Sequence, residues 1–221
     1  MNQAQFFSHS IKRLCNNKPL LPAEYQPVEY IEASGTQRIN TGVSISSSLE
    51  THIVAQMTAP NYFGSLAGGR NARSSNGRYI PFGIGDSNDY RLRCCYGSYD
   101  LYINSPRAST VLEIIYNDVS HKMYVNGSQV ANFGSANFSD NSPVTLCLFT
   151  LNGYDGNGSY NFHGAGKIWS VTLYNNSTGD KLGDFIPCYR KSDNKPGMYD
   201  LVTTTFFTNI GTGEFTVGNN V

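Results

Sequence analysis

The sequence has no net charge. Its 221 residues include 16 Lys and Arg and 16 Asp and Glu, which give a formal charge of zero at pH 7. Proteins that bind nucleic acid or anionic lipid through bulk electrostatic attraction carry an excess of positive charge. The composition therefore predicts no nucleic-acid partner and no binding to a membrane surface.

Long apolar runs are also lacking. No stretch of the chain approaches the roughly 18 apolar residues that a membrane-spanning helix needs. Lys12 and Arg13 lie near the N-terminus, but no apolar segment follows them as it would in a signal peptide. We therefore expect no membrane insertion, and we expect the protein to be made in a cytoplasm.

Closely spaced cysteine pairs of the C-x-x-C type are missing. The chain has five cysteines, an odd number, and two of them are adjacent. A disulfide framework uses an even number of cysteines, and a zinc site typically uses the C-x-x-C spacing. The sequence therefore predicts reduced thiols at Cys15, Cys94, Cys95, Cys147 and Cys188.

The motifs of common enzyme classes are absent. There is no G-x-S-x-G nucleophile motif, and the glycine-rich stretch 64–69 lacks the lysine of a phosphate-binding loop. A glycoside hydrolase needs two carboxylates about 5 to 10 Å apart. Glu29 and Glu32 form the only close pair of glutamates, and a separation of three residues puts them on opposite faces of a strand. The sequence therefore predicts that the protein is not an enzyme.

What is present is the composition of strands and turns. The chain contains 22 Gly, 15 Tyr and 12 Phe, and only 14% of its residues are charged. Short apolar runs alternate with Gly, Asn, Ser and Pro, and no helical period is evident. Asn126-Gly127 is typical of a type I′ turn between two strands. We expect an all-β, two-sheet antiparallel sandwich with strands near 29–31, 37–40, 50–57, 62–68, 79–85, 90–96, 111–116, 121–125, 129–133, 144–151, 167–174, 206–208 and 214–217.

Two local patterns predict further detail. In the run 167–174, strand alternation puts Trp169 on one face with Val171 and Leu173, which predicts a core position for the single tryptophan. In the run 184–201, Pro187 is expected to cap an edge strand, with turns at 191–194 and at Pro196-Gly197. Arg190 is expected to form an ion pair with Asp193 or Asp200, which would hold the turn.

Residues 1–24 differ from the rest of the chain, so we divide it into an N-terminal arm, 1–24, and one domain, 25–221. Pro19 and Pro22 predict an extended connection between the two. The arm is either a disordered tail or an anchor peptide, because apolar side chains are costly to leave in water. The anchor hypothesis assigns docking to Phe6, Phe7, Ile11 and Leu14.

A cluster of aromatic and basic residues is the best candidate ligand site. Aromatic faces stack on sugar rings, and arginine donates hydrogen bonds to sugar hydroxyls. The segment 90–102 is rich in both, and a further tyrosine lies in the glycine-rich loop that follows residue 151. The candidate ligand-binding residues are Tyr90, Arg91, Arg93, Tyr96, Tyr99, Tyr102 and Tyr154.

Two oxygen-rich loops could hold a calcium ion, which prefers six to eight oxygen ligands. The candidate ligands are Asp86 and Asp89 in one loop and Asp155 and Asn157 in the other. The alternative is that these residues serve only the geometry of turns. Neither loop has the spacing of an EF-hand.

Two parts of the chain match a known pattern. Residues 28–42 read V-E-Y-I-E-A-S-G-T-Q-R-I-N-T-G. The last third contains N-G-S-Y-N-F-H-G-A-G-K-I-W-S-V-T-L-Y and D-F-I-P-C-Y-R-K-S-D-N-K-P-G-M-Y-D-L-V-T-T-T-F-F-T-N-I-G-T-G-E-F-T-V-G. From about Tyr25 to the C-terminus, the chain resembles laminin-G-like (LamG), concanavalin-A-like jelly-roll domains of bacteriophages and prophages of gut bacteria.

The resemblance implies a jelly roll whose first and last segments, 36–42 and 206–213, lie side by side. It implies a virion protein, such as a head or tail fibre or a surface decoration, present in several copies or as a homo-oligomer. The arm would attach it to other virion proteins, and the domain would bind a host-surface glycan. A purely structural cementing protein is the alternative. A glycan-cleaving enzyme is disfavoured because the E-x-D-x-x-E triplet of hydrolases with this fold is missing.

Overall fold

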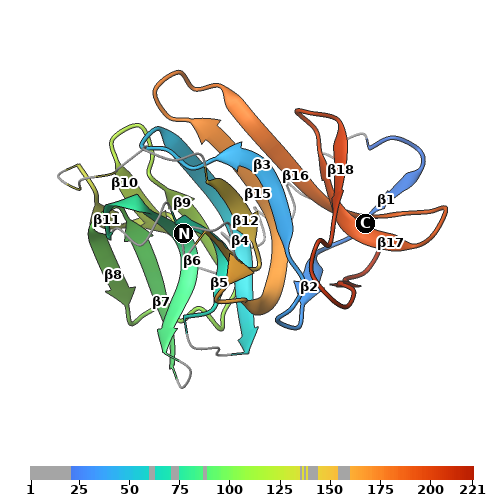
Figure 1. Ribbon diagram of the computed structural model, residues 1–221, viewed down its shortest axis with the longest axis horizontal. Helices are drawn as coiled ribbons and strands as arrows, with labels where there is room; N and C mark the ends of the chain where they lie inside the picture. Colours follow the sequence, from blue (N-terminus) through green and yellow to red (C-terminus); the bar gives the residue numbers. More distant parts are fainter. Residues whose placement is uncertain are drawn as a thin grey trace.

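The computed structural model describes residues 21–59, 63–70, 75–86, 89–134, 136, 138, 144–153 and 160–221. These residues form two sheets packed face to face as a sandwich, almost wholly antiparallel (Figure 1). The all-β, two-sheet architecture expected from the sequence is confirmed. The only helix in the described part of the chain is one short 3₁₀ turn, η1 (Ser75–Gly77).

The larger sheet has eleven strands. β1 pairs with β16, and β2 lies between β15 and β19. Eight strands form its main path, in the order β11 (Ser128–Asn132), β10 (Lys122–Val125), β9 (Leu112–Tyr116), β4 (Leu49–Ala59), β15 (Ala165–Asn175), β16 (Lys181–Arg190), β17 (Lys195–Asp200) and β18 (Thr205–Thr208). The others are β1 (Tyr25–Pro27), β2 (Ile31–Ala33) and β19 (Thr216–Val217).

The smaller sheet has eight strands. β12 joins it by pairing with both β5 and β3. Its main path runs β14 (Tyr160–Asn161), β13 (Leu151–Asn152), β5 (Ser65–Arg70), β6 (Arg78–Asp86), β7 (Asp89–Tyr96) and β8 (Tyr99–Ile103), and its other strands are β12 (Thr145–Leu148) and β3 (Ile39–Ser44).

The core lies between the sheets because the strands alternate in burial. β4 and β9 place every second side chain in the interior, as a half-buried strand does. One contiguous apolar cluster spans both sheets. Tyr79 is fully buried within it, and its hydroxyl donates a hydrogen bond to the carbonyl oxygen of Leu49 at 2.7 Å. The buried hydroxyl of Tyr116 likewise donates to the carbonyl oxygen of Cys95.

The predicted hairpin between β10 and β11 is confirmed. Asn126 and Gly127 have φ of +50° and +78°, as both central residues of a type I′ turn require. Val125 and Ser128 pair directly across this two-residue turn. The predicted reduced thiols are also confirmed where the structure describes them, since Cys94, Cys95, Cys147 and Cys188 are buried and unpaired.

The predicted core position of Trp169 is wrong. The register of β15 against β4 shifts between Ile168 and Ser170, so a β-bulge interrupts the alternation. Ile168, Val171 and Leu173 are buried, whereas Trp169 is half-buried on the other face. There its ring packs against Tyr30, with 5.1 Å between centroids.

The segment after Asp184 is more regular than predicted. Pro187 lies inside β16, not at the end of an edge strand, and Pro196-Gly197 lies inside β17, not in a turn. A proline fits inside β16 because the strand changes neighbours at this point: β15 pairs with β16 up to Phe185, and β1 pairs with it from Cys188. The carbonyl oxygen of Pro187 accepts a hydrogen bond from the Val28 N–H. The predicted turn at 191–194 is confirmed, and Arg190 pairs with Asp193.

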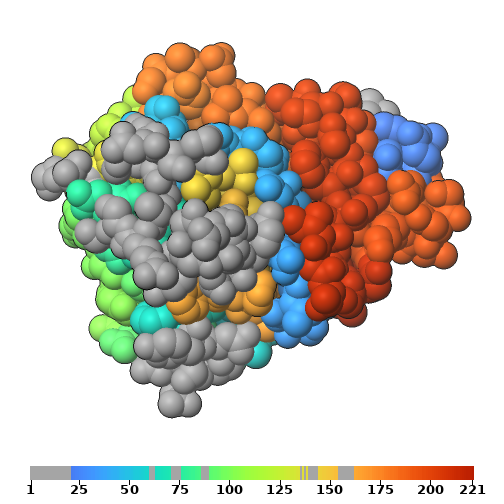
Figure 2. Space-filling view, viewed as in Figure 1, coloured from blue at the N-terminus to red at the C-terminus, as the bar shows by residue number. Residues whose placement is uncertain are grey.

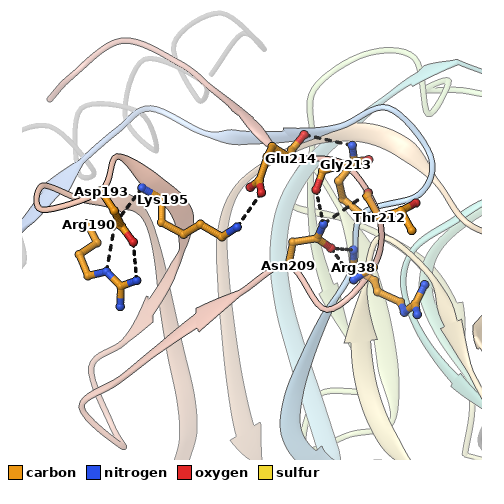
Figure 3. Close-up of polar contacts among 10 residues, drawn as sticks. Arg38, Arg190, Asp193, Lys195, Asn209, Thr212, Gly213 and Glu214 are labelled. Carbon is orange, nitrogen blue, oxygen red and sulfur yellow. Dashed lines mark hydrogen bonds and ion pairs between the residues drawn. The ribbon is translucent and has the colours of Figure 1, made fainter.

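The part of β16 after Phe185, together with β1, β17 and β18, forms what we call the terminal lobe, at the right of Figure 1. Figure 2 shows the first described residues, in blue, beside the last strands, in red, at this end. Segments 36–42 and 206–213 lie side by side, as expected. The side chain of Asn209 accepts a hydrogen bond from the Arg38 N–H at 2.9 Å, and Lys195 forms an ion pair with Glu214 at 2.6 Å (Figure 3).

Candidate ligand-binding site

A second, smaller apolar cluster lies on the outer face of the smaller sheet. Along β7, Leu92 and Cys94 face the core, so strand alternation turns Arg93 and Cys95 outward. Along β6, a register shift after Ile80 interrupts the alternation, and Ile80 also faces outward. The cluster consists of Ile80, Cys95 and Leu151, with Phe162 packed against it.

A cavity of about 210 Å³ lies above this cluster. Its floor is apolar, and the rings of Phe63 and Phe162 meet edge to face beside it with 5.5 Å between centroids. Three arginines also line the cavity. We call this site the arginine pocket, and its described lining is Phe63, Arg70, Arg78, Ile80, Arg93, Leu151 and Phe162.

Two of these arginines are held by one carboxylate. Arg93 binds Asp100 through two hydrogen bonds, Nε to Oδ1 at 3.0 Å and Nη2 to Oδ2 at 2.8 Å. Arg78 donates from Nη1 to Oδ2 of Asp100 at 2.8 Å. Asp100 lies on β8 directly opposite Cys95, so the pairing of β7 with β8 brings the three charged groups together. The geometry fixes the positions of both guanidiniums.

Asp100 and Arg93 are both ionised at neutral pH. Burial alone would raise the pKa of Asp100, but the hydrogen bonds and charge of Arg93, with a further hydrogen bond from Arg78, hold it below its ordinary value. Burial alone would lower the pKa of Arg93, but the ion pair with Asp100 raises it. Two guanidiniums and one carboxylate therefore leave a formal charge of +1.

The thiol of Cys95 lies beneath these three charged groups and stays protonated. Burial raises its pKa to about 12, and its Sγ donates a hydrogen bond to Oδ1 of Asp100 at 3.3 Å. This thiol is therefore not a nucleophile, and it packs in the small apolar cluster with Ile80 and Leu151.

Aromatic rings further restrict the arginines. The guanidinium carbon of Arg93 lies 4.6 Å from the ring centroid of Phe63 and 5.7 Å from that of Tyr102. Arg91 lies over the same tyrosine at 5.6 Å. Stacking of this kind orders a guanidinium while leaving its edge available for planar hydrogen bonds.

The structure places the ligand-binding residues predicted from the sequence in different parts of the fold. Arg93 lines the pocket, and Arg91, Tyr99 and Tyr102 share its strand pair, with exposures of 37% for Tyr99 and 42% for Tyr102. Tyr90 is half-buried, and its hydroxyl donates to the carbonyl oxygen of Thr58 at 3.4 Å.

Tyr96 is a correction, because the structure places it in the core. It is 2% exposed, and its hydroxyl donates a hydrogen bond to the carbonyl oxygen of Ser47 at 2.9 Å. Strand parity accounts for this, since Tyr96 follows Leu92 and Cys94 and not Arg91 and Arg93.

The structure does not test the remaining predicted residues. Asp86 and Asp89 pair through their backbones across β6 and β7, and their side chains lie outside the description. Among the described residues, no group of three or more His, Cys, Asp or Glu is placed to hold a metal. Outside the described residues lie Tyr154, Asp155, Asn157 and the four anchor residues Phe6, Phe7, Ile11 and Leu14.

Sequence reasoning missed Phe63, Arg70, Arg78 and Phe162. They precede β5, end β5, begin β6 and follow β14, so only the fold brings them together. Of these four, only Arg78 could have been found from the sequence. It comes two residues before Ile80 at the start of an apolar run, so strand alternation puts both side chains on the same face.

A broader hollow of about 400 Å³ lies elsewhere, beside the turn between β15 and β16. Nε2 of His52 lies 2.5 Å from Oε1 of Glu50, and the His52 ring packs against Tyr174 at 5.0 Å. Asn176, which also lines it, donates to the carbonyl oxygen of Asn117 at 3.0 Å. Because these polar groups already form hydrogen bonds or ring contacts within the protein, the hollow offers a ligand fewer contacts than the arginine pocket does.

No helix in the described part of the chain is long and apolar enough to cross a membrane. A comparison with models of known protein families found no match, and a search of curated proteins found no significant relative.

Proposed function

We propose that the chain is a carbohydrate-binding module of a bacteriophage particle, built on a concanavalin-A-like, LamG-type jelly roll. The observation that carries the binding function is the arginine pocket. It combines an apolar floor, two phenylalanine rings and three planar cationic donors on the outer face of a rigid sheet. Sugars offer the complementary chemistry, because a pyranose has an apolar face and a rim of hydrogen-bonding groups.

The size of the pocket supports a small ligand. Sites for drug-sized molecules have volumes of roughly 300 to 1,000 Å³. A cavity of about 210 Å³ is better matched to one sugar residue of a longer glycan. A single shallow contact of this kind is weak, so adhesion requires many copies acting together, which a virion supplies.

The virion context rests on the sequence resemblance. In this proposal, the arm 1–24 docks on another virion protein through its apolar side chains, and the terminal lobe lies next to that attachment. The carbonyl oxygen of Glu24 accepts a hydrogen bond from the Lys191 N–H at 2.8 Å, so the chain enters the domain at the tip of the β16–β17 hairpin. The smaller sheet then faces away from the attachment.

A cementing protein with no glycan ligand is the second candidate. It is favoured by apolar side chains exposed in the C-terminal part of the chain, where Val202, Ile210 and Val217 face solvent. Such side chains suit contact with a neighbouring subunit.

Binding of the labelled protein, displayed in many copies on beads, to candidate host cells tests the proposal. We expect binding that periodate oxidation of surface sugars abolishes and that Arg93→Gln weakens. Binding that survives periodate would refute a glycan receptor, and no binding to cells or to a glycan array would favour the cementing role. A parallel sample with a calcium chelator tests whether calcium takes part.

A further inference from the structure

We infer that the chain has a second sugar-binding site, on the outer face of the larger sheet, and that this site takes an uncharged pyranose. We call it the tryptophan corner, and it consists of Tyr30, Glu32, Lys167 and Trp169. The inference rests on the proposed glycan binding and names a class of sugar. The arginine pocket lies on the outer face of the smaller sheet, so the two sites face in opposite directions.

A β-bulge places Trp169 at this surface. The register of β15 against β4 shifts between Ile168 and Ser170, which makes Trp169 the extra residue of the bulge. At the same point β15 changes its other neighbour, because β2 pairs with it up to Ile168 and β16 pairs with it from Val171. Bulges often redirect a side chain next to a functional site. Here the bulge leaves the single tryptophan of the chain half-buried on the outer face.

Tyr30 and Trp169 form the apolar part of the corner. Their ring centroids lie 5.1 Å apart and their planes meet at 57°, so the two rings are tilted against each other. Gly218 lies next to Tyr30, where an added Cβ would come within 2.9 Å of the ring, and its N–H donates to the carbonyl oxygen of Tyr30 at 3.0 Å. Both aromatic residues are only half-buried. An aromatic ring that is held in place and partly exposed suits the apolar face of a pyranose.

Lys167 and Glu32 add charged groups beside the rings. They lie directly opposite each other across β15 and β2, and their side chains are 25% and 30% exposed. Nζ of Lys167 lies 4.4 Å from the centroid of Tyr30 and donates to its hydroxyl at 3.3 Å. It lies 3.9 Å from Oε2 of Glu32, which is too long for a hydrogen bond. Within the described part of the chain, the Glu32 carboxylate accepts no hydrogen bond and the indole N–H of Trp169 donates none.

This combination of groups favours an uncharged sugar. A hydroxyl both donates and accepts, so one sugar hydroxyl between Lys167 and Glu32 would accept from the ammonium and donate to the carboxylate. A second hydroxyl would accept from the indole N–H of Trp169. A carboxylate brought to the same place would be repelled by Glu32, and an amine would be repelled by Lys167. A neutral pyranose therefore uses every group of the corner.

Fluorescence of Trp169 tests the inference directly, because the chain has no other tryptophan. Titrations would use dextran, mannan, galactan and chitotetraose as neutral probes and polygalacturonate as an acidic probe. We expect at least one neutral probe to shift the emission to shorter wavelength, since the sugar removes water from the ring. Polygalacturonate at the same concentration of sugar residues should leave the emission unchanged. An emission that no neutral probe changes would overturn the inference.

Two variants assign the binding to the corner. Glu32→Gln keeps the size of a half-exposed side chain and should weaken binding of the neutral probe by about 10-fold, the scale of a hydrogen bond to a charged group. Trp169→Phe keeps an aromatic ring but lacks the N–H, and binding on a glycan array should weaken by about 3-fold to 10-fold. Asp193→Asn removes the same charge as Glu32→Gln in the terminal lobe, where Asp193 pairs with Arg190, and is the matched control.

The outcomes separate this inference from the proposed function. Glycan binding with unchanged Trp169 emission, or with parent-like affinity in Glu32→Gln, would overturn the tryptophan corner and leave the proposed function intact. Preference for polygalacturonate would overturn it as well, and so would equal losses in Glu32→Gln and Asp193→Asn. If neither the array nor the cell assay reveals glycan binding, the proposed function fails together with the inference.

Discussion

Solution above about pH 9 should destabilise this protein strongly, because its buried thiols must keep their protons. Burial raises the pKa of Cys95, Cys147 and Cys188 to about 12, and it raises that of Cys94 well above the ordinary value of 9.0. In the unfolded chain, each thiol ionises near its ordinary pKa. The stability that these groups contribute is therefore fully present below about pH 9 and is lost as the pH rises toward 12.

The size of the effect follows from this difference. At pH 10, an unfolded thiol with a pKa of 9.0 is mostly ionised while its folded counterpart is not, which costs between about 1 and 2 kcal/mol per thiol. Four such thiols together remove roughly 6 kcal/mol, and small domains are stable by only about 5 to 15 kcal/mol. Burial also raises the pKa of Tyr79 and Tyr116, which adds to the loss. We expect unfolding between about pH 10 and pH 11.

Urea denaturation at a series of pH values, with a reductant present, measures this loss. Fluorescence of Trp169, the single tryptophan, follows unfolding. Cys188→Ala removes one of the four thiols and should reduce the decline in the free energy of unfolding between pH 8 and pH 10 by about a quarter. A free energy that stays level over this range would refute the reasoning, and so would a Cys188→Ala variant with the same pH dependence as the parent.

Three further outcomes are expected. Asp200→Ala should lower the free energy of unfolding by about 3 kcal/mol or more, because this buried carboxylate accepts hydrogen bonds from the backbone N–H groups of Asp184, Val202 and Thr203. The control Asp193→Ala, at an exposed carboxylate, should leave the melting temperature nearly unchanged. Gly197→Ala should prevent stable folding, seen as loss of a cooperative melt, because its Cβ would lie 2.2 Å from the carbonyl oxygen of Phe207. Deletion of residues 1–20 should leave a domain with the parent's melting temperature that no longer enters particles, and unchanged incorporation would refute the anchor hypothesis.

Local chemistry could be predicted from the sequence wherever one short segment determines the result. The type I′ turn at Asn126-Gly127 depends only on two residues that accept positive φ. Trp169 could not be placed, because a bulge that arises from pairing with β4 is invisible in the alternation of one strand. Pro187 was assigned to a strand end because a proline has no N–H, and only the exchange of neighbours along β16 explains its interior position.

Only the part of the candidate site that lies on β7 could be predicted from the sequence. Arg93 was identified from its surroundings, and strict parity along β7 is enough to separate Arg91 and Arg93 from Tyr96. The rest of the pocket could not be inferred, because Arg70 and Arg78 lie on other strands and meet Arg93 only through sheet pairing.

The pairing of β2 with the last strand, β19, affects how the domain responds to mechanical load. Glu32 pairs with Thr216, and Val28 pairs with Asn220, so the outer ends of both segments lie at the same point. A force that pulls these two ends apart acts on one hydrogen bond at a time and separates the pair like a zipper. β1, by contrast, lies along β16 from Tyr25 to Pro27. If the arm attaches the protein as proposed, a pull directed along β1 would load the hydrogen bonds between β1 and β16 together. A load along β1 is therefore shared among its hydrogen bonds, whereas a load that parts β2 from β19 is not.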